Sequence, residues 1–373
     1  MLIDHLSYLH AHISTPALVV DKTQLDTNLL NMQQYADRHN VLLRPHCKTH
    51  KSTLFARWQS ELGAIGLTVA KAEEAEIFAR EGFDDIFIAN EITQKIKAPL
   101  LNRLHASTRL IVGVDHPRHI TLLEEMLDHP RSPLEVRIEI DCGFQRCGIR
   151  PDDDLLPDVA RAVINSPVLH LEGVFTHAGQ AYGASNPEQI KQIAHVEARS
   201  VERARERLRE IGIEIATLSV GSTPTARSVI PREGVTEARP GNYIFYDRIQ
   251  HALGVCAETQ WSLFVLATVI SRPHPTRMVC DAGSKALNLD TGAHGHTQIQ
   301  GYGKLMNTHG VLTRLSEEHG IIELDQPSSL APGAPLLIAP NHACTVANLY
   351  DHYHLFDGDS VQIVPISARG KSR

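Results

Sequence analysis

The chain has 373 residues, of which 42% are hydrophobic and 21% are charged, and its formal net charge is −7. This negative balance argues against a nucleic-acid partner, because proteins that bind nucleic acids usually present a basic face. No stretch approaches the roughly 20 apolar residues of a membrane span, and the start of the chain lacks the pattern of a secretory signal. The six cysteines are scattered, unlike those of a disulfide scaffold. We therefore expect a cytoplasmic protein without a nucleic-acid or membrane partner.

In chain order, the first predicted elements are a strand over Thr15–Val20 and an amphipathic helix over Asp21–Tyr35. A unit then repeats: an apolar run, a polar or glycine-containing loop, and a helical pattern such as Lys71–Arg80 or Ile190–Ile211. The eight apolar runs are Val41–Leu43, Ala64–Val69, Ile86–Ala89, Leu110–Val114, Val136–Ile140, Gly173–Thr176, Thr217–Val220 and Glu237–Pro240. Strands and helices that alternate in this way predict an α/β protein with a (β/α)8 barrel of TIM type. An open doubly wound sheet is the alternative, weakened because no single glycine-rich phosphate turn follows the first strand.

The pattern changes after about residue 255, where strand-like runs are punctuated by glycine and proline without a long helical period. The runs are Ser262–Ile270, Met278–Cys280, Leu336–Ile338 and Val361–Val364. We expect residues 23–254 to form the barrel, and residues 1–22 and 255–373 to form a mainly β domain.

Lys48 is the first candidate for chemistry. It lies in Arg44–Lys51, directly after the first apolar run of the barrel, and barrel active sites are built at the carboxyl ends of strands. Pro45 favours an extended backbone at Arg44, as at a strand end. A lysine among cationic and apolar neighbours loses its proton more easily and can form an imine with a carbonyl cofactor. A solvated basic turn is the alternative for an arbitrary lysine.

Polar side chains also follow the later runs of the barrel. Arg146 lies in the glycine-flanked loop Asp141–Gly148, and His177 and Tyr182 follow the sixth run. After the seventh and eighth runs come Ser222 and Thr223, and then Gly241 and Asn242. Glycines, hydroxyls and exposed amides can cradle a phosphate group, and in barrels this is the usual task of the last two loops. Together with Lys48 they predict a cofactor site, although a single Gly-Ser-Thr loop is more often only a turn.

His342 and Cys344 are candidate metal ligands in the β domain. Alternate residues of an extended chain point to the same side, so both could bind one ion. Imidazole and thiolate suit zinc, and two protein ligands leave positions open for water or substrate. A buried cysteine beside an ordinary histidine is the alternative from spacing alone. His294 with His296, and His352 with His354, have the same spacing but rank below this pair.

These motifs resemble fold-type III pyridoxal-phosphate enzymes, in which an alanine-racemase-like barrel is joined to a β domain. Within them, the chain resembles the D-threonine aldolase and D-serine dehydratase family over nearly its whole length. The resemblance implies that Lys48 holds pyridoxal 5′-phosphate at the Schiff-base position and that Arg146 contacts the phenolic oxygen of the cofactor. It also implies cofactor contacts from His177 and Tyr182, phosphate contacts from Ser222, Thr223, Gly241 and Asn242, and a homodimer.

The choice within the family depends on fewer residues. The aldolase branch typically has an aspartate two residues after its metal histidine and a triple glycine in its phosphate loop, whereas this chain has Cys344 and Val220-Gly221-Ser222. His342-Ala343-Cys344 is similar to the zinc-dependent dehydratases of D-serine and D-threo-3-hydroxyaspartate. The resemblance therefore implies a lyase that removes water from a D-3-hydroxy amino acid with the help of zinc, or of manganese or a similar divalent ion. A D-threonine aldolase, a racemase and a non-catalytic carrier of pyridoxal phosphate are the alternatives.

Overall fold

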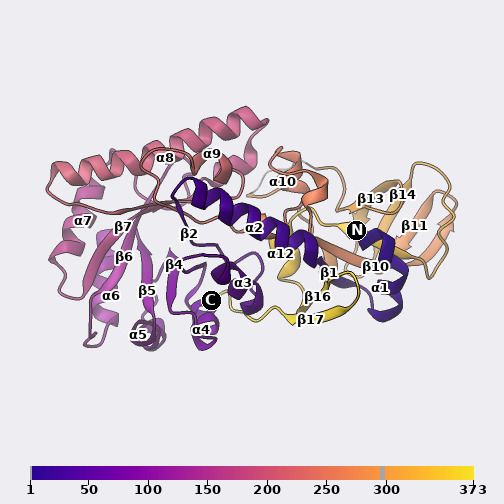
Figure 1. Cartoon of the computed structure of the whole chain (residues 1–373), viewed down its shortest axis with the longest axis horizontal. Helices are drawn as coiled ribbons and strands as arrows, with labels where there is room; N and C mark the ends of the chain where they lie inside the picture. Colours follow the sequence, from indigo (N-terminus) through magenta and orange to yellow (C-terminus); the bar gives the residue numbers. More distant parts are fainter. Residues whose placement is uncertain (1, 295–298) are drawn as a thin grey trace. The chain divides into compact units, whose positions relative to one another are not determined.

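The computed structural model describes residues 2–294 and 299–373, which form two units. One unit contains Met32–Gly241 with Gly370–Arg373, and the other contains the chain up to Asn31 with Asn242–Arg369. Among the sequence candidates, only His296 lies outside the described residues. Figure 1 shows the helices and strands of both units in sequence colours.

Parallel strands β2 to β9 form a single eight-stranded sheet with the order β2-β9-β8-β7-β6-β5-β4-β3. Its two ends join, because Thr68 donates its backbone N–H to Pro45 at 2.9 Å and accepts one from Cys47 at 2.8 Å. The predicted barrel is therefore confirmed, and each of the eight apolar runs overlaps a strand. The strands are β2 (Leu42–Leu43), β3 (Leu67–Val69), β4 (Asp85–Glu91), β5 (Arg109–Val114), β6 (Leu134–Ile140), β7 (Leu169–Thr176), β8 (Thr217–Val220) and β9 (Glu237–Ala238).

Helices alternate with these strands along the chain, and Figure 1 shows α5 to α8 on the outer side of the sheet. The longest, α8, begins after Asn186, whose side chain accepts the backbone N–H of Gln189 at 2.9 Å, and has Pro187 in its first turn. Both features favour a helix start. The helices are α3 (Thr53–Glu61), α4 (Ala72–Arg80), α5 (Ala98–Ser107), α6 (Pro117–Met126), α7 (Leu155–Asn165), α8 (Pro187–Glu210) and α9 (Ala226–Val229), with short 3-10 turns η2 (Lys95–Lys97) and η3 (Gly179–Gly183).

The barrel interior combines aromatic packing with buried charge. Phe87 and Phe175 pack edge to face with ring centroids 4.9 Å apart. Beside them the carboxylate of Glu237 accepts hydrogen bonds from Arg44 at 2.8 Å and from Arg137 at 3.0 Å. Burial disfavours the charge of Glu237, but Arg137 and Arg44 hold the pKa of this carboxyl well below its usual value. This ion network links β9 to β6 and to the residue that follows β2.

The second unit is built on a nine-stranded sheet with the order β13-β14-β11-β10-β1-β16-β17, in which β15 also pairs with β10 and with β12. Its pairings are antiparallel except that of β1 with β16. The strands are β1 (Ala17–Asp21), β10 (Leu263–His274), β11 (Arg277–Cys280), β12 (Lys304–Leu305), β13 (Gly310–Leu315), β14 (Gly320–Leu324), β15 (Pro335–Ala339), β16 (His352–Phe356) and β17 (Val361–Pro365).

The helices that accompany this sheet are mostly short. They are α1 (Leu6–His12), α10 (Arg248–Ala252), α11 (Ser284–Leu287) and α12 (Ala343–Ala347), with 3-10 turns η1 (Leu2–His5), η4 (Asn242–Ile244) and η5 (Glu258–Gln260). Helix α2 (Lys22–Arg38) begins in this unit and ends in the barrel unit. None of the helices described in either unit is long and apolar enough to cross a membrane.

Candidate active site

Lys48 lies in the turn Cys47–His50 that follows strand β2, and its side chain is half-buried. The neighbouring His46 is held by its backbone, which pairs with Thr68 and with Pro240. Burial lowers the pKa of His46 well below its usual value, and so do the nearby charges of Lys48, Arg239, His177 and Arg146. Three residues proposed from the sequence, Lys48, Arg146 and His177, therefore lie near the same uncharged imidazole.

Arg146 lies in the loop after β6 and reaches two other side chains. Its guanidinium lies 3.6 Å from a carboxylate oxygen of Glu139 and 5.4 Å from the ring centroid of Phe144. Phe144 in turn packs edge to face against His177, with ring centroids 5.8 Å apart. The loop that carries Arg146 thus contacts the residue after the next strand, as the sequence pattern requires for one shared site.

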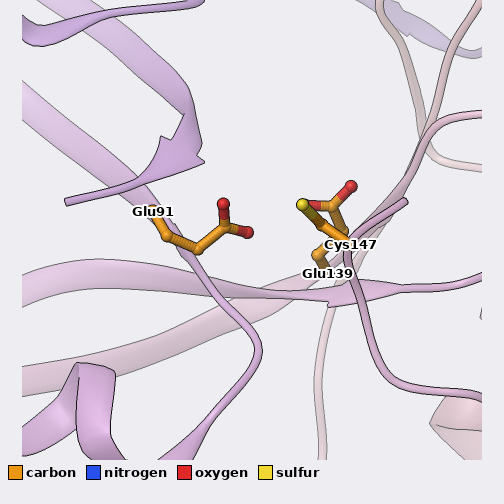
Figure 2. A group of neighbouring side chains, drawn as sticks. All are labelled: Glu91, Glu139 and Cys147. Carbon is orange, nitrogen blue, oxygen red and sulfur yellow. The ribbon is translucent and has the colours of Figure 1, made fainter. Parts of the chain in front are cut away.

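Glu91, Glu139 and Cys147 form an acidic group beside Arg146 that sequence reasoning missed. Figure 2 shows their side chains converging, and their ligand atoms all lie within 4.8 Å of one another. Burial and the neighbouring Glu91 raise the pKa of Glu139 to about 8. Glu139 therefore takes up a proton more readily than an ordinary carboxyl group.

His177 and Tyr182 belong to the segment that follows β7. The Nδ1 atom of His177 lies 2.9 Å from the carbonyl oxygen of Gly221, which links this segment to the loop after β8. Tyr182 is buried in the 3-10 turn Gly179–Gly183.

The two loops proposed to bind phosphate, one with Ser222 and Thr223 and one with Gly241 and Asn242, meet the steric and polar requirements of an anion site. At Gly241 a Cβ atom would lie 2.8 Å from the carbonyl oxygen of His46, so only glycine fits. Ser222 and Thr223 are buried, and the Thr223 Oγ1 atom has no hydrogen-bond partner among the described residues. The same holds for the Oδ1 atom of the buried Asn242. Buried polar atoms normally have partners, so these groups fit a site that a polar ligand completes.

Arg239 is a further residue that sequence reasoning missed. It follows β9, is buried, and donates through its terminal nitrogens to Ser219 and to the carbonyl of Thr176. Its Nε atom lacks a partner in the part of the chain that the structure describes. The signal available in the sequence was its position, two residues before Gly241 at the end of the eighth apolar run.

The extended backbone expected at His342 and Cys344 is wrong. His342 precedes helix α12 and Cys344 lies inside its first turn, where Ala343 donates its backbone N–H to Asp247 at 2.9 Å. The two side chains nevertheless interact: burial disfavours protonation of His342, but Cys344 and Asp290 raise the pKa of this imidazole to about 10. The Nδ1 atom of His342 lies 3.2 Å from a carboxylate oxygen of Asp290. A metal-binding histidine is commonly oriented by such a carboxylate, so the pair fits a metal ion.

The lower-ranked histidine pair on strand β16 behaves differently. His352 and His354 face the same side, with ring centroids 5.0 Å apart. His354 places its Nδ1 atom 3.2 Å from the carbonyl oxygen of Leu18, in the pairing of β16 with β1. This contact fits a role in the sheet.

Two sequence families match the chain. One is described as the N-terminal domain of alanine racemase and matches residues 20–248, and the other is described as a putative serine dehydratase domain and matches residues 262–356. The chain therefore belongs to the fold-type III pyridoxal-phosphate enzymes, in the family of the D-serine dehydratases and D-threonine aldolases. The expected fold and enzyme class, a pyridoxal-phosphate-dependent lyase, are confirmed.

Individual relatives cover almost the whole chain. A D-threo-3-hydroxyaspartate dehydratase of Delftia sp. strain HT23 is 35% identical over 94% of this chain and 96% of the relative. A D-threonine aldolase of Arthrobacter sp. is 33% identical over 97% of this chain and 94% of the relative. A D-serine dehydratase of Dictyostelium discoideum is 30% identical, with 94% and 95% covered.

The solved structure of the Delftia enzyme has a TM-score of 0.88 to this chain at 34% identity, covering 95% of this chain and 98% of the other. Solved structures of D-threo-3-hydroxyaspartate dehydratase include a histidine-to-alanine variant and a metal-free cysteine-to-alanine variant.

Proposed function

We propose that this enzyme removes water from a D-3-hydroxy amino acid and releases a 2-oxo acid and ammonia, with pyridoxal phosphate and a divalent metal, preferably zinc. The observation that carries the proposal is the pair His342 and Cys344, backed by Asp290. The cysteine stands where the aldolase branch typically has an aspartate. The metal-free cysteine variant of the related dehydratase supports a metal role for this pair.

The residues proposed for the cofactor belong to the barrel unit, apart from Asn242, which is the first residue after it. Lys48 would hold it covalently, Arg146 would contact its phenolic oxygen, and the phosphate would lie against Ser222, Thr223, Gly241 and Asn242. The unpartnered Nε atom of Arg239 is a donor suited to the pyridine nitrogen. His177 and Tyr182 would line the same site. When bound, the cofactor supplies an electron sink for the bond broken at the substrate Cα.

Lys48 is the candidate base for the Cα proton of the substrate. Its amine would serve as this base when it is not bonded to the cofactor. His46 does not compete as a cation, because its pKa is lowered well below the usual value and its Nδ1 atom faces the backbone N–H of Lys48 at 3.4 Å. The positive charges around it, among them Arg239 and Arg146, favour negative charge that develops on the substrate.

His342 and Cys344 would hold the metal, with Asp290 orienting the imidazole. Hydroxide leaves poorly, and a Lewis acid on the substrate β-hydroxyl would assist its departure. Two protein ligands leave coordination positions open for that hydroxyl.

D-threonine aldolase is the second candidate, because the same residues serve cleavage of the Cα–Cβ bond. The aldolase of Arthrobacter, at 33% identity, is almost as similar as the dehydratase of Delftia. A non-catalytic carrier is disfavoured by the match of residues 262–356 to a dehydratase domain.

Product analysis tests the proposal. The purified enzyme is incubated separately with D-serine, D-threonine and D-threo-3-hydroxyaspartate, and 2-oxo acid, ammonia, glycine and aldehyde are measured. A dehydratase yields 2-oxo acid and ammonia in equal amounts. Glycine and an aldehyde from D-threonine would instead establish the aldolase, and no turnover of any of the three would contradict both.

A further inference from the structure

Glu197 is a carboxylate placed in the apolar stripe of a helix. The buried side of α8 is otherwise apolar or small, and Glu197 lies on it between Ala194 and Val201. Its side chain is completely buried, with an exposed fraction of 0%. A carboxylate at such a position loses its hydration and must be compensated by hydrogen bonds.

The compensation comes from the loop that we assign to the cofactor phosphate. One oxygen of Glu197 accepts the backbone N–H of Gly221 at 2.9 Å, and the other faces the Thr225 hydroxyl at 2.7 Å. A further hydrogen bond comes from the backbone of Ala178, in the segment after β7. Glu197 therefore anchors the phosphate loop to helix α8 through Gly221 and Thr225.

The hydroxyl groups of Thr225 and Ser222 continue the hydrogen-bond chain from the Glu197 carboxylate. The Thr225 Oγ1 atom lies 2.8 Å from the Ser222 Oγ atom, and either of the two can donate. Each hydroxyl has a single proton, so the direction of one hydrogen bond sets the direction of the other. With Glu197 ionised, Thr225 donates to Glu197 and Ser222 donates to Thr225. The Ser222 hydroxyl then offers a phosphate oxygen only lone pairs, which repel it.

We propose that binding of a phosphate group at Gly221–Thr225 places a proton on Glu197 and reverses this relay, so that Ser222 becomes a donor to the phosphate. The proton comes from solvent. Protonated Glu197 donates to Thr225, Thr225 donates to Ser222, and Ser222 donates to a phosphate oxygen. This inference rests on the proposed function, because it uses the same loop for the cofactor phosphate.

The charges around Glu197 agree with uptake of a proton. Burial raises its pKa to about 7, although the hydrogen bonds from Thr225 and Gly221 and the charge of Arg239 act in the opposite direction. A phosphate dianion in front of the loop adds negative charge and raises the pKa further. Burial raises the pKa of the nearby Cys142 thiol to about 12, so it stays neutral.

Two histidines near the loop, His46 and His177, could also take up protons and must be distinguished from Glu197. His46 has its pKa lowered well below the usual value, and His177 holds the carbonyl of Gly221. Both persist in a Glu197→Gln variant, so a difference between that variant and the wild type reports Glu197 alone.

Calorimetry on the whole chain freed of cofactor tests the relay. The probe is pyridoxine 5′-phosphate, which has the phosphate but no aldehyde to react with Lys48. Binding in buffers of different ionisation enthalpy gives the number of protons taken up. We expect this number, wild type minus Glu197→Gln, to rise from about 0.1 at pH 6 to about 0.9 at pH 8. The affinity of the wild type relative to the variant should fall about fivefold from pH 7 to pH 8 and almost tenfold per pH unit above pH 8.

The variants separate the relay from simple support of the loop. In Glu197→Gln the amide N–H donates permanently to Thr225, so binding should be retained without linked uptake. Thr225→Val removes the middle hydroxyl, so Ser222 can donate to the phosphate in either state of Glu197. Binding should therefore be retained while the linked proton uptake is reduced, whereas Glu206→Gln, at a position of α8 outside the relay, should behave as wild type. Binding without proton uptake by the wild type overturns this inference alone. No binding of the phosphorylated probe by the wild type overturns the phosphate site itself, and the inference with it.

Discussion

At the scale of single residues, His342 and Cys344 differ most from what their spacing suggested. Alternation along an extended chain was the wrong reason to pair them, because the main chain turns into α12 between them. Residues two positions apart lie on the same side of a strand. Here the backbone instead enters a helix at Ala343, whose N–H donates to Asp247, 96 positions away. Such long-range contacts are invisible in the sequence. For the same reason the sequence did not point to Arg239 and Glu197, whose importance follows from the residues that they contact in the folded chain.

Cys344→Ala should remove the metal and leave the cofactor bound, because Lys48, Arg146 and the loop at Ser222 and Thr223 lie in the barrel unit and Cys344 does not. We expect metal content to fall from about one per chain to near zero, loss of 2-oxo acid formation, and unchanged visible absorbance of the bound cofactor. Elemental analysis and a spectrum check this, with Cys280→Ala on strand β11 as the control. Full dehydratase activity in metal-free Cys344→Ala would show that the pair is structural.

At the scale of elements, the barrel strands were predictable because each is a short apolar run followed by a polar loop. Helix α8 was predictable to within a few residues, since its buried positions recur at helical spacing from Ile190 to Leu208. The charged barrel interior was not predictable. Arg44, Arg137 and Glu237 are inside because they pair with one another and with Asp85 and Glu172, and that pairing requires the closed sheet.

Asn186→Ala should destabilise the start of α8 by about 1 kcal/mol, because the backbone N–H of Gln189 loses its acceptor. Denaturant unfolding monitored by circular dichroism measures the change. Asn186→Asp keeps an acceptor and should remain close to wild type; equal loss in both variants would mean that the cap has no role.

At the scale of the whole molecule, Glu237 couples strand β9 to β2 and β6 through Arg44 and Arg137. Glu237→Gln should lower the free energy of unfolding by about 3–5 kcal/mol, because it leaves buried cations without their partner. Since the folded pKa of Glu237 is lowered, its contribution is complete above the ordinary carboxyl pKa and is lost as pH falls below that value. Because the loss is complete only at the much lower folded pKa, the difference in unfolding free energy between variant and wild type should be slightly smaller at pH 4 than at pH 7, and smaller again at pH 3. A pH-independent difference would contradict this account.

A homodimer is expected from the family resemblance. Light scattering at the concentrations used for activity should give twice the mass of the 373-residue chain. A monomer mass with full activity would exclude an active site shared between subunits.

The central claim is that Lys48 carries the cofactor of this enzyme, and one measurement tests it most directly. Borohydride treatment of the holoenzyme, followed by peptide mapping, locates the lysine to which the cofactor becomes fixed. We expect the adduct on Lys48, and no adduct in Lys48→Ala. Lys51→Ala is the control, because Lys51 is already engaged with Glu74 at 3.1 Å and Ser372 at 3.0 Å, and it should still give the adduct on Lys48. An adduct on Lys51, or on any other lysine, would contradict the account.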